Sequence, residues 1–183
     1  VRPEPNHGGT ILSKMTDAEQ ADGYSLVLSQ GRLQINFVKR WLDDALRLET
    51  DATLNANVWQ HILVTYDGTR VAAGVQVFID GKPQKLRILL DFLNQTFATK
   101  EPLRVGGGNG PAGRFHGHID ELRLYDDVLT ETEALALATT ESISQLAALP
   151  LEKRTASQQQ KLQSCFLDKA APQAIRDVHE QVV

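Results

Sequence analysis

The hydrophobic residues of this chain follow two different periods, and the change between them near residue 130 most constrains the fold. From Ile11 to Asp127 the apolar residues mostly alternate with polar ones, and the clearest example is the run Leu33, Ile35 and Phe37. Such alternation is typical of β-strands that bury one face, because successive side chains point to opposite sides. After Asp127 the spacing becomes helical. The sequence therefore predicts an all-β domain followed by α-helices.

Short turn signals separate the predicted strands. Residues 29–32 divide two alternating segments, and Asp80-Gly81 follows an alternating run that ends at Ile79. Asp-Gly favours a two-residue hairpin turn because glycine tolerates a positive φ. Residues 59–66 are apolar on both faces and predict a central strand. Strands separated by turns, with no helices between them, indicate an antiparallel two-sheet jelly-roll sandwich.

The last predicted strand covers residues 115–125, and its apolar spacing is irregular. Ile119 and Leu122 are three residues apart, whereas Leu122 and Leu124 are two apart. One extra residue at Asp120-Glu121, a β-bulge, would produce this change of phase. We expect the bulge to fit the curvature of the sandwich, and the alternative is that it directs Asp120 towards a ligand.

Helix-start signals occur after the predicted strands. Thr130 with Glu133, and Thr155 with Gln158, have the spacing of capping boxes, in which side chains satisfy free N–H groups. Pro172 suits the first turn of a further helix. The apolar side of that last helix would consist of Ile175, Val178 and Val182.

Composition excludes several classes of protein. The 183 residues carry a formal net charge of -4, so we expect no nucleic-acid partner, because such proteins usually present a basic face. Cys165 is the only cysteine, which excludes an internal disulfide. No apolar run approaches the roughly 18 residues of a membrane span, so no membrane insertion is expected. The start at Val1, without methionine, suggests a piece of a longer protein.

Five motifs occur in order along the alternating part of the chain. They are GGTILSK at 8–14, GYSL at 23–26, WQHILVTYDG at 59–68, GVQVFIDGK at 74–82 and FHGHIDELRLY at 115–125. In order and spacing they resemble the laminin-G-like branch of the concanavalin A-like lectin/glucanase superfamily. The resemblance implies a jelly roll over residues 1–137, with residues 138–183 as a helical linker or stalk towards a downstream domain.

Further segments narrow the resemblance to one planctomycete lineage. They are residues 36–41, 45–47, 91–93, 99–103 and 149–155. In that lineage the jelly roll lies in large exported proteins, downstream of a c-type cytochrome region and upstream of a domain of unknown function. The resemblance implies an extracytoplasmic location, with flanking domains of the parent protein as partners. It also implies one or more missing N-terminal strands, and hence an open sheet edge for self-association.

Some members of the superfamily are enzymes with a catalytic motif that this sequence lacks. Glucanases of this superfold use two glutamates on one strand, in a Glu-x-Asp-x-x-Glu arrangement. Here the acidic pairs Asp120-Glu121 and Asp126-Asp127 are adjacent, so their members would point to opposite faces. We therefore expect a non-catalytic module.

Calcium is the metal that the resemblance favours. Related folds often carry a structural Ca²⁺, with one ligand from an aspartate on the last strand, in a position similar to Asp120. A hard cation needs several oxygen ligands, so Asp120 alone does not make a site, and bonding to nearby backbone is the alternative. His116 and His118 share a strand face, but two ligands make a weak metal site and we expect them to face solvent.

Three residues are candidates for contact with a ligand. Trp41 and Tyr24 are the aromatic residues best placed to stack on a sugar, although core packing explains them equally well. Asn109 lies in the glycine-rich segment 106–110, which lacks the features of a phosphate cradle and predicts an inter-strand loop at the sandwich rim. The resemblance implies a lectin-like module of a larger exported protein that binds carbohydrate or another extracellular polymer. The alternative is a structural spacer or protein–protein interaction domain without a small ligand.

Overall fold

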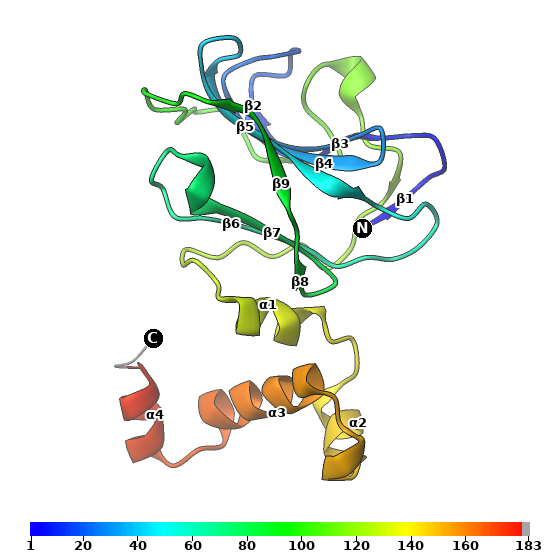
Figure 1. Cartoon of the computed structure of the whole chain (residues 1–183), viewed down its shortest axis with the longest axis vertical. Helices are drawn as coiled ribbons and strands as arrows, with labels where there is room; N and C mark the ends of the chain where they lie inside the picture. Colours follow the sequence, from blue (N-terminus) through cyan, green and yellow to red (C-terminus); the bar gives the residue numbers. More distant parts are fainter. Residues whose placement is uncertain (181–183) are drawn as a thin grey trace. The chain divides into compact units, whose positions relative to one another are not determined.

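The computed structural model describes residues 1–180, in two compact units. The first unit combines Val1–Ile79 with Pro83–Val128, and the second combines Asp80–Lys82 with Leu129–Val183. The first unit is a sandwich of two β-sheets (Figure 1). The predicted domain boundary at residue 137 falls inside a helix of the second unit.

The larger sheet has six antiparallel strands in the order β10-β2-β3-β4-β5-β9. Their bounds are β2 Gly9–Met15, β3 Gly23–Ser29, β4 Arg32–Arg40, β5 Asp44–Thr53, β9 Leu86–Asp91 and β10 Arg104–Val105. The smaller sheet has the order β6-β7-β8, with β6 Ile62–Tyr66, β7 Val75–Ile79 and β8 Lys82–Pro83. A short pair joins β1 Arg2–Pro3 to β11 Gly117–His118. The architecture confirms the predicted antiparallel sandwich followed by helices.

Both predicted hairpin turns are present. Gln30 and Gly31 connect β3 to β4 with φ values of 50° and 78°. Asp80 and Gly81 connect β7 to β8 with φ values of 51° and 74°. Two consecutive positive φ angles are the requirement of a type I′ turn, whose twist matches that of the strands.

The hydrophobic core lies between the two sheets. The alternating residues of β4, β5 and β7 meet there. They are Leu33, Ile35, Phe37, Leu46, Leu48, Val75, Val77 and Ile79. The ring of Phe37 lies 4.4 Å from that of Tyr66 and 5.1 Å from that of Phe97, measured between centroids. Burial of each such side chain contributes about 1.5–3 kcal/mol, so this layer accounts for much of the fold's stability.

The strand predicted over residues 59–66 is shorter and lies elsewhere in the sheet. β6 begins only at Ile62 and is the end strand of the smaller sheet, not a central one. The Trp59 side chain is 48% exposed, with the Arg2 guanidinium 5.4 Å from its ring centroid. The backbone at Gln60 pairs with Val1 instead, because its N–H donates to the Val1 carbonyl at 2.9 Å.

The prediction of a long final strand is wrong. Only Gly117 and His118 form β11, and their partners are Pro3 and Arg2. The short strand β1 offers no further partner, so residues 119–125 have no neighbouring strand in the described part of the chain. The expected bulge does not form there, and Glu121 adopts a positive φ of 52°.

The second unit consists of helices whose starts the sequence largely predicts. They are α1 Glu131–Ala138, α2 Ile143–Ala148, α3 Ala156–Lys169 and α4 Gln173–Glu180. Capping boxes at Thr130 and Thr155 are confirmed, and a third at Ser142 opens α2. Val182 of the predicted apolar side lies outside the described residues. Among the helices described, none has the length and apolar character needed to cross a membrane.

A buried carboxylate attaches the loop after β9 to the start of β5. The Asp44 side chain is 1% exposed, and its Oδ1 accepts hydrogen bonds from the backbone N–H groups of Asn94 (2.8 Å) and Gln95 (3.2 Å). The Asn94 N–H contributes most to holding the pKa of Asp44 below its usual value, and it outweighs the opposing effect of burial. The ionised form of Asp44 is therefore the one that the folded state favours.

We expect Asp44→Asn to be less stable than the wild type at about pH 7, with the difference shrinking below about pH 4. The folded-state pKa is depressed, so the charge contributes stability above the unfolded value of about 3.9 and loses it as pH falls through the folded value. Denaturant unfolding at both pH values measures this. Asp43→Asn, at an exposed neighbour, is the control and should change little. An Asp44→Asn deficit that stays the same in acid would contradict the assignment.

Candidate functional site

A row of polar side chains crosses the face of the six-stranded sheet that points away from the core. Leu33, Ile35 and Phe37 point inward, so Asn36 points outward from β4. The register places Ser25 and Arg47 directly beside Asn36 on β3 and β5. Ser13 of β2 continues the row beside Ser25. Ser13, Ser25 and Asn36 are all buried, and buried polar groups normally find hydrogen-bond partners.

Two loops, one after β2 and one after β10, are attached to each other beside this row. The Asp17 Oδ1 accepts a hydrogen bond from the Gly110 N–H at 3.0 Å, and its Oδ2 lies 3.2 Å from an Arg114 nitrogen. The Asn109 Oδ1 accepts a bond from the Gln20 N–H at 3.3 Å. These contacts place Asn109 at the rim of the outer face, and they fix the loop that the sequence predicts there.

A small hollow on this face is lined by all three predicted ligand-binding residues. Its volume is about 40 Å³, and its lining includes Tyr24, Trp41 and Asn109 together with Asn36. A water molecule occupies about 30 Å³ in the liquid, so the hollow takes one small polar group and not a sugar ring. A polymer bound here would therefore lie across the rim and insert a single group.

Asn36 gives the hollow an unused acceptor. Its side chain is 2% exposed, and its Nδ2 donates to Ser25 Oγ at 3.3 Å. The Oδ1 atom is buried and has no hydrogen-bond partner among the described residues. A buried acceptor left unpaired costs about 1–3 kcal/mol. A hydroxyl group donated by a ligand, or by water, would remove this cost.

Arg47, which sequence reasoning did not single out, packs on Trp41. The Cζ atom of Arg47 lies 3.6 Å from the centroid of the Trp41 ring. Such a contact contributes about 0.5–2 kcal/mol and fixes the orientation of both planar groups. Burial lowers the pKa of Arg47. Arg47 becomes a candidate because it lies directly opposite Asn36. That pairing depends on the register of β4 and β5, which the sequence pattern does not specify.

The ring of Tyr24 belongs to the core. Its centroid lies 6.5 Å from that of Phe37 and 6.3 Å from that of Phe97. Burial raises the pKa of the Tyr24 hydroxyl. The ring thus has the core-packing role that was the alternative for it, and Trp41 remains the aromatic candidate among the residues that line the hollow.

Asp120 lies apart from this hollow on the exposed segment after β11. Its Oδ1 accepts a hydrogen bond from the Glu121 N–H at 2.9 Å. In the described part of the chain, no three His, Cys, Asp or Glu residues lie together as metal ligands would. A calcium ion at Asp120 therefore remains a proposal that rests on the family resemblance. His116 and His118 are exposed, and His116 stacks on His7 with 4.9 Å between ring centroids.

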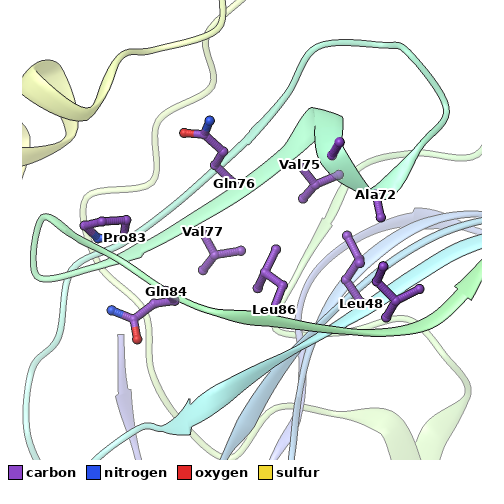
Figure 2. Close-up of a pocket in the computed structure, with 10 residues that line it drawn as sticks. Leu48, Ala72, Val75, Gln76, Val77, Pro83, Gln84 and Leu86 are labelled. Atoms are coloured by element: carbon purple, nitrogen blue, oxygen red, sulfur yellow. The ribbon is translucent and has the colours of Figure 1, made fainter.

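A larger, apolar groove opens between the two sheets. Its volume is about 280 Å³, and Figure 2 shows Leu48, Val77 and Leu86 among the residues around it. The polar side chains in its lining are Gln76 and Gln84, and no charged residue lines it. The groove is therefore bordered by apolar core residues and two glutamines, whereas the hollow on the outer face is bordered by Asn36 and Asn109.

Comparison with known proteins identifies the family. Residues 1–134 match the Laminin_G_3 family model, described as the concanavalin A-like lectin/glucanases superfamily. The chain therefore belongs to this superfamily, as its five motifs predicted. Domains of this kind are generally non-catalytic binding modules. The narrower likeness to a planctomycete lineage stays a prediction.

Comparison with individual proteins gives weaker similarity than the family model does. No curated protein matches the chain. Among solved structures it is similar to residues 221–444 of an S-layer domain-containing protein from Clostridium thermocellum ATCC 27405. The two are 18% identical with a TM-score of 0.37, and the match covers 76% of this chain and 66% of that one.

The glycine-rich loop is held against the sheet, and we expect Gly108→Ala to loosen it. Gly108 has a φ of 101°, and an added Cβ would lie 2.0 Å from Ser13 Oγ, which donates to the Gly107 carbonyl at 2.8 Å. Gly68→Ala is the control, because φ is 81° there and nothing lies within 4 Å. Both variants carry the strain of a positive φ. Gly108→Ala should lose about 0.5–1.5 kcal/mol more in denaturant unfolding, and an equal loss would contradict the contact.

Proposed function

We propose that this domain is a non-catalytic, lectin-like binding module of a larger exported protein, and that it binds carbohydrate or another extracellular polymer. The observation that carries the proposal is the hollow on the outer face, where Trp41 and Asn109 lie beside the unpaired Asn36 Oδ1. The carbon atoms of a sugar ring can contact an aromatic face. The sugar hydroxyl groups can form hydrogen bonds with the amide groups and with the buried acceptor.

The place of the hollow in the fold supports a binding role. It is built on rigid strands, and the two loops beside it are attached through Asp17 and Asn109. A site arranged before the ligand arrives loses less conformational entropy on binding. Membership of the laminin-G-like family also supports an extracytoplasmic location. We propose that the flanking domains of the parent protein are the covalent neighbours of this domain.

A second candidate function is protein–protein interaction, and β9 favours it. This strand is an edge of the larger sheet, and its neighbourhood exposes large apolar side chains. Ile88 is 56% exposed and Phe92 is 59% exposed. Self-association through a sheet edge left open by missing N-terminal strands, which the resemblance implies, also remains a proposal. Size-exclusion chromatography would reject it by finding a monomer.

A glycan and polymer array with the wild type and Trp41→Ala tests the binding role. We expect binding of at least one polymer, with Trp41→Ala weakening it tenfold or more, equivalent to about 1.4 kcal/mol. Trp59→Ala is the matched control, because Trp59 is exposed and is not among the residues lining the hollow. The control should bind as the wild type does.

Two results would count against the lectin-like proposal. The folded wild type could fail to bind any polymer, which would leave the interaction or spacer role. Alternatively, Trp59→Ala could lose binding while Trp41→Ala keeps it, which would place the ligand away from the outer face.

A further inference from the structure

Arg47 differs from the other arginines of the larger sheet because it has no acidic partner. Arg32 and Arg87 both pair with Glu49, and Arg40 pairs with Asp43. Arg47 contacts the Trp41 ring, and its Nε is buried without a hydrogen-bond acceptor. Within the described residues, no carboxylate forms an ion pair with it. A half-buried guanidinium without a counter-ion is an unusual feature, because burial penalises its charge.

The surroundings of Arg47 carry an excess of positive charge. The cluster of charged side chains around Glu49 and Arg47 holds three guanidinium groups and one carboxylate, a local net charge of +2 in a chain of net charge -4. Farther along β5, Asp51 is paired with Lys85 and does not change this excess. The guanidinium groups belong to Arg32, Arg47 and Arg87, and the carboxylate belongs to Glu49. A field of this sign favours an anionic group beside Arg47.

The Glu49 charge is already satisfied and does not neutralise Arg47. Burial on its own would raise the pKa of Glu49, but hydrogen bonds from Gln34 and Arg87, with the charges of Arg87 and Arg32, lower it. The carboxylate is therefore ionised and shared between two other arginines. An anionic group on a ligand would supply the counter-ion that Arg47 lacks among the described residues.

We propose that the outer face binds a polysaccharide that contains uronic acid, with a sugar carboxylate paired to Arg47 and a hydroxyl group donated to Asn36 Oδ1. The guanidinium fork matches the two oxygens of a carboxylate, and the Trp41 ring holds its plane in place before binding. Asn36 is the cross-strand neighbour of Arg47, so one acidic sugar can span both groups. A single unpaired guanidinium suits separated carboxylates and not a dense polyanion. The proposal rests on the lectin-like function and specifies its ligand.

Isothermal titration with three oligosaccharides of equal length tests the inference. They are an oligouronate, its carboxyl-reduced neutral form and a sulfated neutral oligosaccharide. We expect the folded wild type to bind the oligouronate at least tenfold more tightly than the neutral form. It should also prefer the oligouronate to the sulfated one, because a planar carboxylate fits the fork. This comparison needs no variant, so it holds even if substitutions at Arg47 disturb folding.

Variants then assign the preference to one side chain. Arg47→Gln should bind the two unsulfated forms about equally, and Arg47→Lys should retain part of the preference because it keeps charge but loses the fork. Arg123→Gln removes an exposed guanidinium paired with Glu121 and should behave as the wild type. A wild type that binds neutral and acidic forms equally would overturn the inference and leave the lectin-like function intact. If none of the array polymers or oligosaccharides binds, both proposals fail.

Discussion

The pairing of β4 with β5 is the constraint on which both the core and the candidate site depend. Phe37 lies opposite Leu46 on the inner face, and Asn36 lies opposite Arg47 on the outer face. Side chains alternate with a period of two, so a shift of one residue would exchange the two sets. The burial of Phe37 and Leu46 stabilises this register, and the register in turn keeps the Asn36 amide and the Arg47 guanidinium on the outer face. Core packing and site geometry are two consequences of one register.

Part of the fold follows from sequence patterns that act over a few residues. Asp80-Gly81 predicts its hairpin because the turn chemistry is local, and Thr130 and Thr155 predict helix starts for the same reason. The final strand was predicted wrongly because alternation at residues 115–125 says nothing about a partner, and β1 supplies only two residues. Pattern thus determines which residues can form a strand, whereas pairing determines which of them do.

The candidate site was predicted only in part, for a similar reason. Trp41 and Asn109 can be chosen from residue type and loop position, and both line one hollow. Tyr24 cannot be assigned from type alone, because its ring packs against Phe37 and Phe97 in the core. Arg47 was missed because its significance depends on the absence of an acidic neighbour, which is a property of the three-dimensional arrangement. Whether a buried polar group lacks a partner depends on all the groups around it, and these come from several strands that are distant in the sequence.

In the proposed function, the outer face receives the ligand, and the apolar groove between the sheets does not. Side-chain NMR of the ¹⁵N-labelled domain during titration with an oligouronate tests it most directly. We expect saturable shifts of the Arg47 Nε and Asn36 Nδ2 resonances, while the Arg123 Nε resonance stays unchanged. Shifts confined to Gln76 and Gln84 at the groove, with Arg47 and Asn36 unaffected, would contradict it.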